Sequence, residues 1–163
     1  MNPETRPWHE WPITELVPHQ GPMCLLERVL SCAGDELAAQ ARISPDQLFL
    51  DSQGPGEGLG AWVGIELMAQ AVAAWAGVQG RLRGEPPRIG LLLGSRRYRS
   101  QQARLAAGSV LRIEVRREFQ ADNGLGQFDC RILQADGAVL ATAQLTVFGP
   151  PDPHEFLKEE RHD

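Results

Sequence analysis

Apolar and polar residues alternate near the start of the chain in a way that predicts two paired β-strands. The first run, residues 25–33, is rich in aliphatic side chains and leads into the turn sequence AGDE. In the second run, residues 37–43, every other side chain is apolar, which is the period of a strand with one buried face. The two runs and their turn predict a hairpin. Residues 1–15 are polar and proline-rich, and they predict an extended lead-in that ends in a short helical turn.

One long apolar segment in the middle of the chain, residues 61–82, predicts an α-helix. The segment is apolar on nearly all sides until its last two turns, so we expect a buried helix with a sheet around it. A loop rich in glycine and proline, residues 44–60, leads into the helix, and Gly84 ends it. The polar residues within and next to the segment argue against a membrane span.

The chain after the helix has the pattern of four strands, at residues 89–98, 109–119, 127–133 and 138–148. The second strand changes phase at Phe119, which indicates a bulge. The sequence ADG before the last strand predicts a tight turn. The last strand is expected to bury one face, formed by Val139, Ala141, Ala143, Leu145 and Val147.

The order of two strands, one buried helix and four strands predicts an α+β architecture in which the helix packs on one antiparallel sheet. The hot-dog fold, a long central helix wrapped by a curved sheet, has this order. We expect a single hot-dog domain over residues 1–150, including its N-terminal lead-in. Residues 151–163 are expected to form a polar C-terminal tail.

Composition narrows the range of functions. A chain of 163 residues with 42% hydrophobic residues is long enough for one globular domain, and a net charge of -5 argues against nucleic acid as a partner. The cysteines, Cys24, Cys32 and Cys130, form no CxxC pair and predict reduced thiols in the cytoplasm. The first residues, MNPETRPWHEW, lack the apolar run of a signal peptide. Phosphate-binding loops, nucleophile elbows and metal-ligand spacings are absent from the sequence.

Two ionisable side chains stand in apolar surroundings. Around Glu66 the predicted helix carries no other charge until Arg81. A carboxyl group in an apolar pocket keeps its proton more readily than one in water. This property suits a general acid. His19 stands in LVPHQGPM between two prolines, with an imidazole suited to proton transfer near neutrality. The ordinary alternatives are a Glu66 at a helix edge or bonded to a backbone donor, and a His19 exposed in a loop or engaged in a capping bond.

Two further clusters have both a functional and an ordinary explanation. Glycines 58, 60 and 64 surround the start of the helix, where free N–H groups could hold an oxygen that gains charge, or where glycine simply allows close packing. The segment 94–104 concentrates arginines, among them Arg96, Arg97 and Arg99, in an acidic protein. Such a cluster predicts docking of an acidic partner or a phosphate group, or a strand edge kept from aggregating by its charge.

Two motifs resemble one family. LVPHQGPMCLLERVL, at 16–30, resembles the N-terminal segment of hot-dog β-hydroxyacyl-(acyl carrier protein) dehydratases. GIELMAQAVAAWAG, at 64–77, is similar to their central-helix motif, in which a carboxylate precedes Met-Ala-Gln. The likeness is greatest to the divergent branch linked with aryl-polyene-type pathways. One departure is clear: the catalytic histidine of the housekeeping enzymes falls near Ser52, and no histidine lies between His19 and His154.

The resemblance implies elimination of water from a 3-hydroxyacyl thioester on acyl carrier protein. It implies a proton-transferring Glu66, with His19 as the candidate base, and no metal or redox cofactor. The family's oxyanion position falls at Ala61, so Gly60, Ala61 and Gln70 are the expected substrate-binding residues. Arg96, Arg97 and Arg99 are the expected docking residues for the acidic carrier protein.

The resemblance also implies an active site at a dimer interface, in a homodimer or with a related hot-dog chain. The alternatives are a weakly active or inactive relative that serves as an acyl-binding subunit of a heteromeric dehydratase, and a hot-dog acyl thioesterase in which Glu66 activates water.

Overall fold

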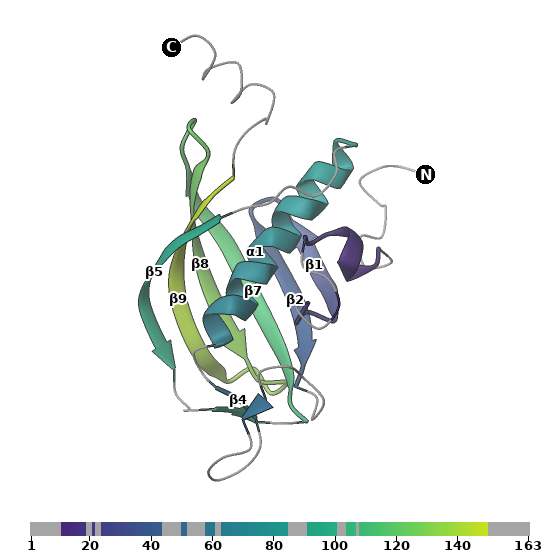
Figure 1. Ribbon diagram of the computed structural model, residues 1–163, viewed down its shortest axis with the longest axis vertical. Coiled ribbons are helices and arrows are strands. Elements are labelled where there is room, and N and C mark those ends of the chain that lie inside the picture. The colour runs from purple at the N-terminus through teal and green to yellow at the C-terminus, as the bar shows by residue number, and fades with distance from the viewer. Residues whose placement is uncertain are drawn as a thin grey trace.

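A curved antiparallel sheet of six strands wraps one long helix in the computed structural model (Figure 1). The structure describes residues 11–18, 21, 24–43, 50–51, 58–60, 63–84, 91–100, 104–106 and 108–149. The helix is α1 (Val63–Leu82). In sheet order, the strands are β1 (Arg28–Ala33), β2 (Glu36–Arg42), β7 (Val110–Gln120), β8 (Leu125–Leu133), β9 (Val139–Phe148) and β5 (Leu91–Ser100). This is the predicted α+β hot-dog architecture.

The prediction of a structureless loop at 44–60 is wrong for the described part of that segment. A second, three-stranded sheet contains β3 (Leu50–Asp51), β4 (Gly58–Gly60) and β6 (Arg104–Ala106). Strands of two or three residues are too short to show a period in the sequence, so β6 was missed as well. This small sheet lies beside the end of the main sheet at which α1 begins (Figure 1).

Two other boundaries differ from the prediction for identifiable reasons. The first strand begins at Arg28 rather than at residue 25, because Leu25 and Leu26 are buried in the core without belonging to the strand. In β9, Val139 is 39% exposed whereas Leu140 is 5% exposed. Leu140 is an extra residue opposite the Ile132–Leu133 step of β8, so the alternation of β9 reverses there. The predicted bulge in β7 is confirmed beside Phe119.

The core lies between α1 and the concave face of the sheet. Leu67 and Met68 of the helix are fully buried, as are Ile113, Ile132 and Leu145 of the central strands. Burial of one such side chain stabilises the fold by about 1.5–3 kcal/mol. Among the described residues, no helix is long and apolar enough to span a bilayer.

The C-terminal half of α1 is fixed to the turn between β1 and β2. The indole nitrogen of Trp75 donates a 2.9 Å hydrogen bond to the carbonyl oxygen of Gly34, and its ring packs edge-on against Phe128. The guanidinium group of Arg117 lies 4.8 Å from the Trp75 ring and pairs with Asp35. These contacts set the rotation of α1 about its axis, which decides where the polar side chains of its first half point. Gly84, with φ of 75°, ends the helix as predicted.

Candidate functional site

One stripe of α1 faces the N-terminal segment rather than the sheet. Its members are Glu66, Gln70, Gly77 and Arg81, which lie four, seven and four residues apart and therefore share one side of a helix. Each of Gln70, Gly77 and Arg81 contacts residues between Glu15 and Leu25. The described start of this segment, residues 11–18, lies beside α1 (Figure 1).

Gln70 connects Glu66 to the N-terminal segment. Its amide nitrogen, Nε2, donates a 3.0 Å hydrogen bond to Oε1 of Glu66. Its amide oxygen, Oε1, accepts a 2.8 Å hydrogen bond from the backbone N–H of Leu25. Gln70 has no exposed surface, so water cannot replace either bond without opening the packing. The amide therefore fixes the orientation of the half-buried Glu66 carboxyl group.

The other end of the stripe fixes the segment before His19. A Cβ atom at position 77 would overlap the carbonyl oxygen of Leu16, so Gly77 is needed for this close approach. One turn further along, Arg81 pairs with Glu15 and lies 4.6 Å from the centre of the Trp11 ring. The short 3-10 helix η3 (Ile13–Glu15) confirms the helical turn predicted for this region.

The predicted base, His19, lies outside the described residues, so the structure gives no distance between it and Glu66. Described residues on both sides of it are packed or hydrogen-bonded. Val17, two residues before it, is 2% exposed and donates a backbone hydrogen bond to Ile13. Leu25, six residues after it, is bonded to Gln70. The segment that carries His19 is therefore anchored to α1 on both sides of that residue.

The start of α1 packs closely against β5. A Cβ atom at Gly64 would lie 2.5 Å from the hydroxyl oxygen of Tyr98, so only glycine fits there without displacing the tyrosine. Gly60, a predicted substrate-binding residue, ends β4 three residues before the helix and pairs with Arg104 of β6. Ala61, the expected oxyanion position, lies outside the described residues.

The predicted docking residues lie together on β5. A bulge in this strand makes their side chains point in different directions. Arg96 is opposite Gln144 of β9 and Arg99 is opposite Thr142, while Arg97 and Tyr98 together take the place of one residue. Directly opposite residues point to the same face, so Arg96 and Arg99 lie on the outer face of the sheet with Gln144 and Thr142. Arg97 has φ of 57°, an uncommon value for a residue other than glycine, and all three arginines are exposed.

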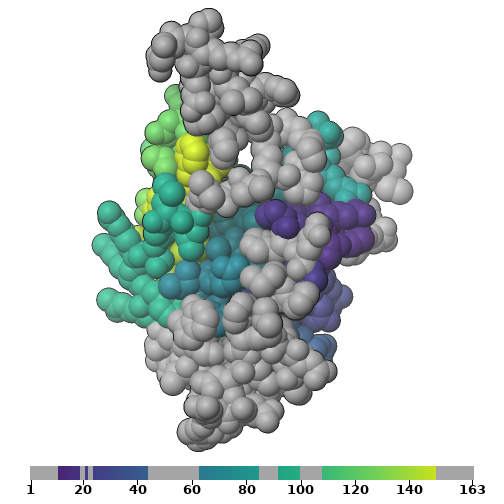
Figure 2. All heavy atoms as spheres, in the orientation of Figure 1, coloured from purple at the N-terminus to yellow at the C-terminus, as the bar shows by residue number. Residues whose placement is uncertain are grey.

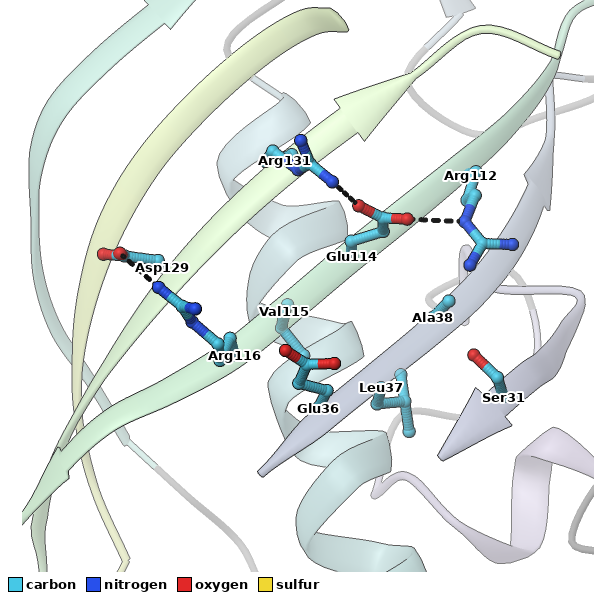
Figure 3. Close-up of a pocket in the computed structure, with 10 residues that line it drawn as sticks. All are labelled: Ser31, Glu36, Leu37, Ala38, Arg112, Glu114, Val115, Arg116, Asp129 and Arg131. Carbon is cyan, nitrogen blue, oxygen red and sulfur yellow. Dashed lines mark hydrogen bonds and ion pairs between the residues drawn. The ribbon is translucent and has the colours of Figure 1, made fainter. Parts of the chain in front are cut away.

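A hollow on the outer face of the sheet is unsuited to an acyl chain, because charged side chains line it (Figure 3). Glu114 pairs with both Arg112 and Arg131, and Arg116 pairs with Asp129. Burial alone would raise the pKa of Glu114, but hydrogen bonds from the two arginines lower it below its usual value. The hollow is an ion-paired surface, on the side of the sheet away from Glu66.

The catalytic role of Glu66 and the substrate-binding role of Gln70 stay predictions, and the sequence did not indicate the hydrogen bond that joins the two side chains. A glycine in the interior of a helix, such as Gly77, often indicates a close approach of another part of the backbone. No sequence pattern indicated the direction of the Tyr98 side chain, because that direction depends on the bulge in β5. Within the described residues, no group of three His, Cys, Asp or Glu side chains could hold a metal ion.

Comparison with known proteins identifies the family. The family model described as "ApeP dehydratase" matches residues 11–158. A chain of the dehydratase heterocomplex ApeI:P from Xenorhabdus doucetiae is 33% identical, with a TM-score of 0.79 over 91% of this chain and 96% of that one. A search of curated proteins by sequence found no significant match.

More distant structures share the fold alone. A hypothetical thioesterase from Streptococcus pneumoniae, solved with coenzyme A, is 16% identical, with a TM-score of 0.57 over 74% of this chain and 83% of that one. The PaaI protein from Escherichia coli is 12% identical, with a TM-score of 0.57 over 74% and 77%. The family match and the 33% identical heterocomplex chain, which both extend over most of the sequence, show that this chain belongs to the ApeP-like dehydratase family.

Proposed function

We propose that this chain takes part in the dehydration of 3-hydroxyacyl thioesters on acyl carrier protein to trans-2-enoyl thioesters. One observation carries the proposal: Glu66 is held by Gln70 on the stripe of α1 that faces the anchored segment containing His19. A carboxyl group of fixed orientation, one helical turn from the glutamine that binds the backbone of Leu25, suits acid and base chemistry shared with a histidine six residues earlier in the chain. The family supports a dehydratase, and the carrier-bound acyl substrate is our finer assignment.

The proposed reaction moves two protons and releases one water. His19 accepts the proton from the carbon next to the thioester carbonyl. The electron pair of that C–H bond forms the new double bond, and the bond from the adjacent carbon to its hydroxyl group breaks. Glu66 donates its proton to the departing hydroxyl, which leaves as water. Transfer of a proton from His19 back to Glu66 completes the cycle.

The start of α1 supplies the expected stabilisation of the carbonyl oxygen. Free N–H groups and the positive end of the helix dipole favour the negative charge that develops there. The backbone at Gly60 and Ala61 is the proposed donor region. The hydrogen bonds of Gln70 support a role in which it acts through Glu66, and its direct contact with substrate stays a prediction.

The partners are also part of the proposal. The relative from Xenorhabdus doucetiae belongs to a dehydratase heterocomplex, and we propose that this chain likewise works with a related hot-dog chain. Exposed Arg96, Arg97 and Arg99 are the proposed docking residues for an acidic carrier protein. We place the reaction in the cytoplasm, in keeping with the free thiols of the cysteines.

The test uses this chain alone and assembled with its partner, supplied with a 3-hydroxyacyl carrier protein. We expect loss of one water from the acyl chain, measured by mass spectrometry. Glu66→Gln and His19→Asn should each slow the reaction by about 10²–10⁴-fold. Glu118→Gln, at an exposed outer position, and His154→Asn serve as matched controls and should keep the original rate.

The absence of a histidine near Ser52 favours a second candidate, a non-catalytic acyl-binding subunit. If Glu66→Gln and His19→Asn leave the rate of the complex unchanged, the catalytic assignment is wrong and the subunit role takes its place. Release of free carrier thiol from a saturated acyl thioester, without enoyl product, would instead indicate a thioesterase.

A further inference from the structure

Phe119 of β7 is turned out of the core by the bulge in its strand. The alternation of buried Ile113 and Val115 would continue to Phe119 and direct its ring toward α1. Glu118 is an extra residue at this point, so Phe119 lies opposite Gln127 and shares the outer face of the sheet with it. Phe119 is 60% exposed, more than any other large apolar residue in the described part of the chain. The fold therefore presents an aromatic ring to water at a position where the strand pattern alone would bury it.

Two further apolar side chains lie beside Phe119 and form a patch with it. Leu125 of β8 and Phe148 of β9 are directly opposite each other and half-buried. Each lies three residues from a member of the buried pair Phe128 and Leu145, an odd number, so both point to the outer face. Leu125 is also the diagonal neighbour of Phe119 across the β7–β8 pair, at a typical separation of about 7–8 Å. We call Phe119, Leu125 and Phe148 the outer apolar patch.

The chain leaves the sheet beside the outer apolar patch. The backbone N–H of Gly149 donates a 3.0 Å hydrogen bond to the carbonyl oxygen of Gly124, in the turn between β7 and β8. The end of β9 and this turn lie side by side at the visible surface (Figure 2, yellow and green). The described residues end at Gly149, and residues 150–163 follow with the sequence PPDPHEFLKEERHD. The large apolar side chains of this segment are Phe156 and Leu157, so it begins next to the patch and carries one apolar pair.

The segment is long enough to reach the patch. Phe156 is seven residues after Gly149, and seven extended residues span up to about 24 Å. Phe119 is two strands away from β9, or about 10 Å across the sheet. The match to the family model extends to residue 158, beyond the end of β9. The family model therefore covers the apolar pair as well as the sheet.

We propose that residues 150–158 fold back over the outer face of the sheet and that Phe156 and Leu157 cover the outer apolar patch. Attachment to β9 favours this occupant over a second copy of the chain, because a tethered segment is present at an effective concentration on the order of millimolar. The hollow elsewhere on the outer face is unsuited to the apolar pair, since ion-paired arginines and carboxylates line it (Figure 3). The inference is independent of the dehydratase chemistry, because the patch and α1 lie on opposite faces of the sheet.

A double-mutant cycle in the full chain tests this contact. Phe156→Ser/Leu157→Ser removes the covering side chains, and Phe119→Ser removes the most exposed part of the patch. We expect each change to lower the midpoint of thermal unfolding, Tm, by about 3–5 °C, and the combination to lower it little further than either change alone. An uncovered Phe119 would give no such cost, because an exposed side chain loses no burial when it is replaced.

The matched control is Glu155→Ser/Lys158→Ser, which changes the polar residues on either side of the apolar pair without changing the net charge. It should keep the wild-type Tm. Hydrogen exchange gives a direct measurement, since the amides of residues 156–158 should exchange more slowly in wild type than in the Phe119→Ser protein. Equal exchange in the two proteins, additive effects in the cycle, or a Phe119→Ser protein with the wild-type Tm would overturn the inference.

Sedimentation at several protein concentrations separates the other occupant of the patch. We expect Phe119→Ser to leave the oligomeric state unchanged and its Tm shift to be independent of protein concentration. A dimer that Phe119→Ser dissociates, with Tm shifts that grow with protein concentration, would assign the patch to a second copy and contradict the inference.

Discussion

Glu66 lies one helical turn before Gln70, and the side-chain amide of Gln70 donates a 3.0 Å hydrogen bond to its carboxyl group. The same amide accepts the backbone N–H of Leu25, so one buried side chain joins the predicted acid to the segment that follows the predicted base. Orientation of the carboxyl group and attachment of the segment are therefore coupled through Gln70.

Gln70→Ala should impair activity and stability together. It leaves the buried N–H of Leu25 without its acceptor, which costs about 1–3 kcal/mol in the free energy of unfolding. It also releases the Glu66 carboxyl group, and a misplaced catalytic group costs up to about 100-fold in turnover. Gln79→Ala on the same helix is the matched control, because the bonds of Gln79, an exposed 3.4 Å bond to Gly34 and one with the thiol of Cys32, lie away from Glu66 and Leu25. Equal effects of the two variants, in chemical denaturation and rate assays, would contradict the coupling.

Gly77→Ala should loosen the N-terminal segment from α1. The added methyl group overlaps the backbone carbonyl of Leu16, which cannot move without breaking the packing of that residue. We expect a loss of about 1–3 kcal/mol in unfolding free energy, despite the better helix propensity of alanine. Gly94→Ala is the comparison, since a methyl group there meets open space. A Gly77→Ala protein as stable as wild type would show that the contact is not needed.

Gly64→Ala should cost less stability when the tyrosine hydroxyl is removed. The new methyl carbon would lie 2.5 Å from the Tyr98 hydroxyl oxygen, so the single variant should be less stable than wild type. In a Tyr98→Phe background the 2.5 Å contact disappears and a 3.2 Å contact with Ile132 remains, so the alanine should cost less stability than it does beside the tyrosine. Thermal unfolding of the four proteins forms a double-mutant cycle. Additive effects would mean that the two residues do not interact.

The helix and the longer strands could be predicted from the sequence because a buried face leaves a periodic trace. Leu111, Ile113 and Val115 of β7 alternate with charged residues, and all three are buried in the structure. The apolar segment 61–82 predicted α1 to within two residues of its described start. The short strands β3, β4 and β6 could not be predicted, since pairing over two or three residues depends on the fold around them.

The candidate site was predictable in its chemistry and not in its geometry. Glu66 and Gln70 were visible as polar residues within an apolar helix. The direction of Tyr98 was hidden, because it depends on an extra residue in β5, and Arg97 gives no local sign of the left-handed backbone it adopts. The relation of His19 to Glu66 depends on long-range packing of the N-terminal segment, which no local pattern encodes.

Glu114→Gln should destabilise the protein at neutral pH more than in acid. The pKa of Glu114 is lowered in the folded state, so its contribution is present above the pKa of the unfolded chain, about 4.3, and is lost as the pH falls through the lower folded value. For partly exposed pairs with Arg112 and Arg131, we expect about 1 kcal/mol or less at pH 7. Asp122→Asn, in the exposed turn between β7 and β8, is the control. A difference from wild type that stays constant from neutral to acid pH would contradict this assignment.

Leu16 and Val17 are packed into the same core as α1 and the sheet, so this N-terminal segment is an integral part of the folded domain. A protease that removes the residues before Cys24 would take away Leu16 and Val17 and expose the apolar surface of α1 that they contact to water. Such trimming would therefore not yield a smaller working domain, and a shortened version made for expression should be expected to aggregate.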